Sequence, residues 1–249
     1  MKRRTFLKSA GAIAIAHSLN CIGTIENCVI AKEPFEEYTP GAKSLDFILS
    51  HGLRGSHKDL EPIKTRIREE GYGTLVWDYP DYADNIEDLV LRAGEFKEKY
   101  QIQNPVFGGV SLGGMVSFGA AAKYDCAGLL IINSAHRGTP AFSNVLKSEA
   151  LRRKDCTRHP AKISALVELC GSLIGYEPPI QNINAPVIYI SSEKDEIFPR
   201  EEVEYTISHL TCDYSWTELK NSGHAIYEDR IEEILNLITE QVRKVFGAR

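Results

Sequence analysis

The sequence predicts an α/β fold in a single domain, built from a mostly parallel sheet that is flanked by helices. From residue 32 onward, strand-like and helix-like segments alternate along the chain, which is typical of such sheets. Residues 128–133 and 186–191 are near-continuous apolar runs, as expected of strands covered on both faces. A third strand-like segment, residues 104–110, leads directly into the glycine-rich turn 109–113. These three segments are therefore predicted to be buried strands.

Two further strands and two helices are predicted in the first half of the domain. The strands cover residues 45–50 and 74–77, and the second helix covers residues 86–100. The helix between the strands has the apolar residues Leu60, Ile63 and Ile67 at helical spacing. It is expected to end at the glycine-rich residues 71–73. Asp84 and Asn85 precede the second helix and are candidates for its N-cap.

The second half of the domain is predicted to contain two more helices and an insertion. A small-residue helix is expected over residues 113–123, and a C-terminal helix has apolar residues on one side: Ile231, Ile234, Leu235, Ile238 and Val242. The alternation breaks between residues 137 and 182, where the chain is rich in Arg, Lys, Cys and Ser. Because this stretch lacks strand-like patterns, we expect a helical insertion between two strands.

Residues 1–31 resemble an export signal that precedes the domain of residues 32–249. A head with two adjacent arginines is followed by the apolar, small-residue run 9–16, which is typical of bacterial export signals. The Arg-Arg-x-Phe-Leu-Lys arrangement is similar to twin-arginine signals, so we expect a periplasmic or secreted protein. The apolar run is shorter than the roughly 20 residues of a membrane span. Cleavage after Ala16 and after Ala31 both fit, and a basic amphipathic surface helix is the alternative interpretation.

The charge balance of the chain disfavours a nucleic-acid partner. The formal net charge is −5. Four basic residues against Glu26 give residues 1–31 a net charge of +3, so the rest of the chain carries −8. Nucleic-acid binding requires clustered Lys and Arg that neutralise phosphates. The acidic domain has no such basic stripe.

Four of the six cysteines lie in the expected domain: Cys126, Cys156, Cys170 and Cys212. An even number in an oxidising compartment is compatible with disulfide bonds, and Cys156 and Cys170 lie in one segment and could pair. Four buried, unpaired cysteines are the alternative. No Cys-x-x-Cys spacing indicates a metal site, and we expect neither a metal nor an organic cofactor.

Ser111 is the strongest candidate for a catalytic residue. It lies at the centre of the sequence Gly-Val-Ser-Leu-Gly, residues 109–113, between a predicted strand and a predicted helix. Glycines two positions before and after a serine allow a sharp strand-to-helix turn that lifts the hydroxyl above the end of the sheet. A serine hydroxyl becomes a good nucleophile when a positioned base removes its proton. The turn therefore predicts a nucleophile, and a glycine-rich turn without catalytic duty is the alternative.

Asp195 and His224 supply the residue types that such a nucleophile needs. Asp195 follows a predicted strand and can orient an imidazole. Glu193 and Glu196 are rivals in the same loop, and the form Lys-Asp-x-Ile-x-Pro favours Asp195. His224 lies in a loop before the last helix and is the candidate base. The chain order Ser, Asp, His is the one used by hydrolases with this kind of turn.

Together these motifs resemble the α/β-hydrolase superfamily, in particular its esterases, lysophospholipases and monoacylglycerol lipases. The resemblance covers roughly residues 43–245. It includes His51-Gly52 and the turn or loops around Ser111, Asp195 and His224, in the family's order. It implies the α/β-hydrolase fold and ester hydrolysis without a cofactor.

Backbone amides of Leu112 and Leu53 are expected to bind the oxyanion. The Leu112 N–H lies at a helix N-terminus beside Ser111, and the resemblance assigns the second donor to the residue after His51-Gly52. The chain departs from many relatives after residues 74–77, where it reads Asp-Tyr-Pro-Asp-Tyr-Ala in place of Gly-x-Gly-x-Ser. It also begins at what would be the third strand of the full fold, so we expect a small sheet.

These observations predict a serine hydrolase that cleaves carboxylic esters through an acyl-enzyme on Ser111, with lipid-like esters among its small-molecule substrates. An acyltransferase or thioesterase would use the same triad, and a catalytically silent binding protein on the same fold is an alternative from another class. In relatives the insertion, here residues 137–182, forms a lid over the acyl pocket. Its basic residues either contact an anionic head group or form a solvated helix face: Lys147, Arg152, Arg153, Lys154 and Arg158.

Overall fold

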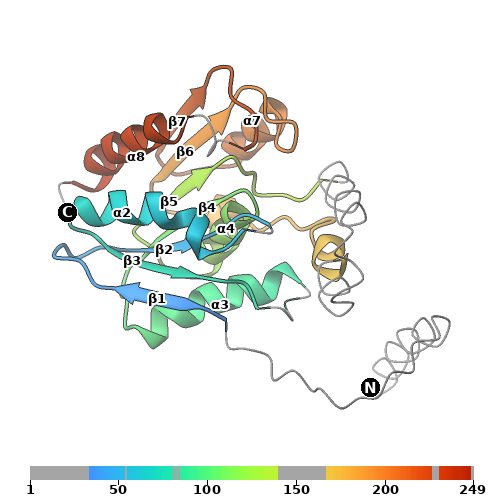
Figure 1. Ribbon diagram of the computed structural model, residues 1–249. Coiled ribbons are helices and arrows are strands. Elements are labelled where there is room, and N and C mark those ends of the chain that lie inside the picture. The colour runs from blue at the N-terminus through green and yellow to red at the C-terminus, as the bar shows by residue number, and fades with distance from the viewer. Residues whose placement is uncertain are drawn as a thin grey trace, which may run out of the picture. The chain divides into compact units, whose positions relative to one another are not determined.

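A seven-stranded sheet forms the centre of the computed structural model, which describes residues 34–53, 55–80, 83, 85–139, 167–225 and 230–247 (Figure 1). The strands are β1 (Glu36–Thr39), β2 (Asp46–Ser50), β3 (Gly73–Trp77), β4 (Val106–Val110), β5 (Gly128–Ile132), β6 (Val187–Ser192) and β7 (Tyr214–Leu219). They are arranged in the order β1-β3-β2-β4-β5-β6-β7. Each neighbouring pair from β3 to β7 is parallel, and β1 is antiparallel to β3. The predicted mostly parallel sheet is confirmed.

Helices cover both faces of this sheet, as predicted. On one face, α2 (Glu61–Glu69) follows the short 3-10 helix η1 (His57–Leu60) and contacts α8 (Ile231–Phe246) (Figure 1). On the other face, α3 (Ile86–Lys99) contacts α4 (Leu112–Lys123). Residues of α7 (Arg200–Ser208) and η3 (Ile180–Asn182) pack into this second layer. The Asn85 side chain accepts the Asp88 N–H at 2.9 Å and caps α3, which satisfies one of the free amides of its first turn.

The alternation of side chains along the strands divides the core into two parts. In β2, Phe47 and Leu49 pack with α2 and α8, whereas Ile48 packs with α3 and α4. All three side chains are at most 1 % exposed. Successive strand residues point to opposite faces, so a strand that helices cover on both sides must be apolar throughout. The apolar runs of β5 and β6 have this origin.

The sheet is larger than expected, because a strand precedes residues 45–50. β1 pairs with β3, from Glu36 opposite Trp77 to Thr39 opposite Thr74. Its residues are half-buried and have the sequence Glu-Glu-Tyr-Thr, without the apolar run of a central strand. Charged residues are typical of edge strands, which have a free side. The expectation of a small sheet beginning at residues 45–50 is therefore wrong.

The two ends of the predicted insertion, residues 137–182, lie within the described chain. Residues 167–172 are helical, and Leu173 and Ile180 are fully buried in the core beside α3 and α4. The C-terminal part of the stretch therefore packs into the body of the domain. Residues 140–166, which hold the five basic residues of interest, are outside the described residues, and a lid there stays a prediction.

Residues 1–33 are also outside the described residues. The export signal, its cleavage after Ala16 or Ala31 and the periplasmic or secreted location stay predictions. Among the described helices, none is long and apolar enough to cross a membrane. Cys126 and Cys212 carry free thiols, whereas the pairing of Cys170 depends on residue 156, which is not described.

The candidate site residues all follow the carboxyl ends of parallel strands. Ser111 comes directly after β4, Asp195 after β6 and His224 after β7. Along the chain, β3 is added on one side of β2 and β4 on the other. Open α/β sheets bind ligands at such a reversal of strand order, outside the carboxyl ends of the strands. The topology therefore brings the three predicted residues to one edge.

Candidate active site

Ser111 occupies a strained position between β4 and α4. Its backbone has φ 55° and ψ −120°, a left-handed φ that costs a non-glycine residue about 1–3 kcal/mol. The Ser111 N–H donates to the Ile132 carbonyl at 3.0 Å, and its carbonyl accepts the Gly114 N–H at 2.9 Å. These bonds, made to β5 and to α4, hold the turn in its strained form. Ser111 is 8 % exposed.

The two glycines of the turn are required by close backbone contacts. A Cβ atom on Gly109 would lie 2.2 Å from the carbonyl group of Gly113. A Cβ atom on Gly113 would lie 2.0 Å from the carbonyl oxygen of Ser50, at the end of β2. Both distances are far below any real contact of a Cβ atom. The turn is therefore packed backbone against backbone, as the Gly-x-Ser-x-Gly pattern predicts.

The structure brings His224 between Ser111 and Asp195. The Nε2 atom of His224 lies 3.0 Å from Ser111 Oγ. Its Nδ1 atom lies 2.9 Å from Oδ2 and 3.0 Å from Oδ1 of Asp195. Because an ionised carboxylate only accepts hydrogen bonds, Nδ1 carries the proton and the lone pair of Nε2 faces the serine hydroxyl. This arrangement allows His224 to take the proton of Ser111.

Asp195 is the acid of its loop that contacts His224. It is 4 % exposed, and its Oδ1 atom accepts the backbone N–H groups of Ile197 and Phe198 at 2.9 Å each. Its rival Glu193 is exposed and accepts the backbone N–H of Asn221 at 2.8 Å. Glu196, the other rival, is exposed as well. The choice of Asp195 among the three acids agrees with this geometry.

The backbone of residues 51–53 lies against Ser111 and places the second predicted oxyanion donor. A Cβ atom on Gly52 would lie 3.4 Å from Ser111 Cβ. Leu112 is the first residue of α4, where a helix leaves its amides free. Within the described residues, neither the Leu112 nor the Leu53 N–H donates to a backbone carbonyl outside the regular elements. The binding of an oxyanion by these two amides stays a prediction.

A cavity of about 170 Å³ opens beside Ser111 and His224. Leu53, Leu60 and Val110 give it apolar walls, and Asp59 adds a carboxylate at its rim. A larger hollow of about 640 Å³ lies around the starts of β6 and β7, at the opposite ends of these strands. Its lining contains none of the three predicted residues. We therefore take the smaller cavity as the site.

His51 and the residues after β3 brace the turn that follows β2. His51 is buried, and its Nε2 atom accepts the Tyr79 N–H at 3.3 Å while Nδ1 lies 2.7 Å from the Gly52 carbonyl. The Tyr79 hydroxyl donates to the His51 carbonyl at 2.5 Å. Asp78 accepts the backbone N–H of His57 at 2.6 Å. Asp78 and Tyr79, the first two residues of the stretch that departs from Gly-x-Gly-x-Ser, thus have a structural role here, and so does His51.

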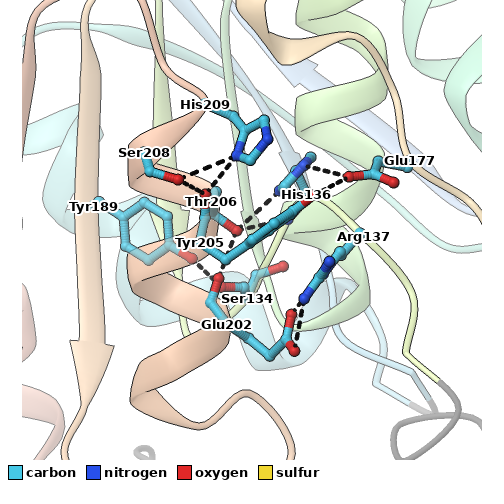
Figure 2. Close-up of polar contacts among 10 residues, drawn as sticks. All are labelled: Ser134, His136, Arg137, Glu177, Tyr189, Glu202, Tyr205, Thr206, Ser208 and His209. Carbon is cyan, nitrogen blue, oxygen red and sulfur yellow. Dashed lines mark hydrogen bonds and ion pairs between the residues drawn. The ribbon is translucent and has the colours of Figure 1, made fainter.

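A second polar cluster lies between the chain after β5 and α7, away from the cavity (Figure 2). His136 is 1 % exposed. Its Nδ1 atom lies 3.0 Å from the Thr206 hydroxyl, its Nε2 atom lies 3.4 Å from the Glu177 carboxylate, and its ring stacks on Tyr205. Burial lowers the pKa of His136 to about 4, although the charge of Glu177 opposes the shift. The cluster ties the chain that leaves β5 to α7.

Asn133 and Ser134, which belong to no motif in the sequence, contact the backbones of His224 and Ser111. The Asn133 side chain donates to the His224 carbonyl at 3.0 Å, and the Ser134 hydroxyl donates to the Ser111 carbonyl at 2.7 Å. A polar pair at the end of a strand is too common to indicate such contacts.

In the described part of the chain, no group of three or more His, Cys, Asp or Glu side chains could hold a metal ion.

Comparisons with known proteins show the fold. Neither a protein-family model nor a curated protein sequence matches this chain significantly. A thermophilic esterase from Thermogutta terrifontis is 19 % identical, with a TM-score of 0.68 over 85 % of this chain and 93 % of that one. MGS-MChE2, an α/β hydrolase enzyme from a sediment metagenome of the Mar Chica lagoon, is 19 % identical, with a TM-score of 0.70 over 86 % and 97 % of the chains.

A monoacylglycerol lipase from Paleococcus ferrophilus is 17 % identical, with a TM-score of 0.65 over 86 % of this chain and 99 % of that one. At such identities a structural likeness concerns the fold and leaves the activity open. The described chain has the α/β-hydrolase fold, as the sequence predicted.

Proposed function

We propose that this protein is a serine hydrolase that cleaves carboxylic esters through an acyl-enzyme on Ser111. The observation that carries the proposal is the placement of His224, whose Nε2 atom lies 3.0 Å from Ser111 Oγ while Asp195 binds Nδ1. A histidine base that a carboxylate orients in this way can activate a serine. Esterases and a monoacylglycerol lipase among the structural neighbours support ester hydrolysis.

In the proposed reaction, His224 accepts the hydroxyl proton as Ser111 Oγ attacks the ester carbonyl carbon. The negative charge that develops on the carbonyl oxygen is bound by the N–H groups of Leu53 and Leu112. The tetrahedral intermediate then collapses, and His224 Nε2 gives its proton to the departing alcohol. Water attacks the acyl-enzyme with the same base, which releases the carboxylic acid and restores Ser111. Asp195 stabilises the imidazolium in both steps.

The substrate we propose is a small ester with a short acyl group. The cavity of about 170 Å³ beside Ser111 has apolar walls and is smaller than the pockets of roughly 300–1,000 Å³ that hold drug-sized ligands. Lipid-like esters would need further surface, and a lid within residues 137–182 stays a prediction. A screen of esters that differ in chain length and head-group charge tests this, and equal rates for neutral and anionic esters of one length would count against a basic lid.

The decisive test of the reaction is the replacement of Ser111 by alanine. We expect the wild-type protein to turn over p-nitrophenyl butyrate and to be labelled by a fluorophosphonate probe. The Ser111→Ala variant should lose both activities and keep its thermal unfolding transition. Ser117→Ala is the matched control, because Ser117 lies in the same helix and donates to the Gly113 carbonyl at 2.8 Å.

The outcomes separate the proposal from its alternatives. A wild-type protein that is neither active nor labelled is a silent binding protein on the same fold. Labelling that survives Ser111→Ala would place the nucleophile elsewhere. A product that carries the acyl group on an added alcohol or thiol, in excess of the free acid, would indicate an acyltransferase that uses the same residues.

A further inference from the structure

Two adjacent residues after β5 contact both sides of the site. Asn133 and Ser134 are 1 % and 0 % exposed. β5 is the neighbour of β4 in the sheet, and its last residue accepts the Ser111 N–H at 3.0 Å. The chain after β5 is therefore the part of the fold next to the turn that holds the candidate nucleophile.

Asn133 holds the loop of the candidate base. Its amide nitrogen donates to the carbonyl of His224 at 3.0 Å, and it lies at a longer 3.4 Å from the carbonyl of Gly223. The backbone N–H of Asn133 donates to the Ile190 carbonyl in β6 at 2.9 Å, which fixes the backbone of Asn133 against this strand. The side chain thus reaches from the end of β5 to the loop after β7. Its Oδ1 atom has no hydrogen-bond partner among the described residues, so its contribution comes through Nδ2.

The backbone of Asn133 explains why this residue type stands here. Its φ is 43°, in the left-handed region that asparagine and glycine adopt most readily. Glycine would accept the conformation but has no donor. Asparagine combines the left-handed backbone with an N–H group that can reach a carbonyl across the site.

Ser134 holds the turn of the candidate nucleophile. Its buried hydroxyl donates to the Ser111 carbonyl at 2.7 Å. The Ser134 carbonyl in turn accepts a hydrogen bond from the Tyr189 hydroxyl of β6 (Figure 2). Ser134 is therefore anchored to β6, the strand that precedes the Asp195 loop in sequence. The hydrogen bond from the Ser134 hydroxyl then holds the Ser111 carbonyl against this anchored segment.

We propose that Asn133 and Ser134 are positioning residues that together set the distance between Ser111 and His224. Asn133 fixes the base through the backbone of its loop, and Ser134 fixes the nucleophile through the backbone of its turn. Neither residue touches the reacting atoms. The inference rests on the proposed function. A misplacement of about 1 Å between reacting groups can cost about 100-fold in rate. The loss of the Asn133 or the Ser134 hydrogen bond should therefore lower kcat measurably.

The test uses the full-length protein and the variant Asn133→Gly, which keeps the left-handed backbone and removes the donor. We expect kcat for p-nitrophenyl butyrate to fall by about 10- to 100-fold, with KM changed by less than about threefold. Gln101→Gly is the matched control, because Gln101 has φ 56° and lies just after α3. It should keep kcat within about twofold. Asn133→Asp, which keeps the backbone but turns an ionised carboxylate towards the His224 carbonyl, should lower kcat at least as much as Asn133→Gly.

A second measurement separates positioning from a general loss of structure. In a His224→Ala background, Asn133→Gly should leave the residual rate unchanged, because the group that it positions is gone. Ser134→Ala should lower kcat in the wild-type background and leave the residual rate of a His224→Ala background unchanged. Residues that act as one unit are non-additive in this way. Thermal unfolding of each variant shows that it is folded.

Each outcome has a defined meaning. If Asn133→Gly and Asn133→Asp keep full kcat, or lower the rate equally with and without His224, the positioning role is refuted while the proposed function stands. If the wild-type protein neither hydrolyses the ester nor reacts with a fluorophosphonate, the proposed function and the inference that rests on it are both overturned.

Discussion

Replacing Asp195 with asparagine separates the orienting role of its carboxylate from its structural role. Oδ1 accepts the N–H groups of Ile197 and Phe198, while Oδ2 lies 2.9 Å from His224 Nδ1. An asparagine that keeps its oxygen on the two backbone amides leaves that oxygen 3.0 Å from Nδ1 and places its NH₂ group where Oδ2 was, 2.9 Å from Nδ1. That group favours the tautomer in which Nε2 carries the proton and cannot accept one from Ser111.

The expected loss is large in rate and small in stability. In a Ser-His-Asp triad, the wrong histidine tautomer lowers kcat by about 10⁴, which corresponds to about 5.5 kcal/mol of activation free energy. Because the two backbone bonds of Oδ1 survive in Asp195→Asn, the free energy of unfolding should change by less than about 1 kcal/mol. Asp195→Ala loses these bonds too and should lower the unfolding free energy by about 1–3 kcal/mol.

The assay compares kcat/KM for p-nitrophenyl butyrate with denaturant unfolding of the same preparations. Glu193→Gln and Glu196→Gln are matched controls, since both acids are exposed and lie in the same loop. Both should keep the wild-type rate within about threefold, because an exposed carboxylate has only a weak, screened effect. An Asp195→Asn variant with more than a tenth of the wild-type rate would refute the reasoning. So would a Glu196→Gln variant that loses as much as Asp195→Asn.

Two further predictions concern stability. Gly113→Ala places a Cβ atom 2.0 Å from the Ser50 carbonyl oxygen and should lower the unfolding free energy by about 3 kcal/mol or more. The control Gly171→Ala, with nothing within 4 Å of the new atom, should leave the unfolding free energy unchanged. Equal melting temperatures of the two variants would contradict the packed turn. His136 has its pKa lowered to about 4 by burial, so its contribution is complete above the unfolded pKa of about 6.5 and is lost as the pH falls towards 4. This amounts to up to about 3 kcal/mol, and His136→Gln should flatten the decline measured by denaturant titration across that range.

The candidate catalytic residues are easier to single out from the sequence than the residues that support them. Ser111 is predictable because a strained strand-to-helix turn needs glycine on both sides, which leaves a five-residue pattern. Asp195 and His224 follow from chain order and from their places after strands. In each case the local sequence carries the signal, because the backbone requirement lies within a few residues. The contacts of these residues then follow from the parallel order of the strands.

The supporting residues leave no such pattern. Asn133 contacts a residue 91 positions away, and Ser134 contacts one 23 positions away. Their hydrogen bonds exist only once β4, β5 and β7 are aligned in the sheet. β1 is hard to predict for a related reason. An edge strand is half-buried, so its residues show no apolar run, and its pairing with β3 leaves no pattern in its own sequence. Long-range pairing decides both, and a single sequence does not display it.

The geometry of the site is held by backbone atoms more than by the side chains that line the cavity. Asp195 is fixed by two backbone amides, His224 through its own carbonyl, and Ser111 through its N–H and carbonyl. The cavity walls, by contrast, are side chains such as Leu60 and Asp59. Substitutions in these walls can therefore change which ester fits without moving the reacting atoms. A fold that separates the two sets in this way can serve different substrates with the same three residues.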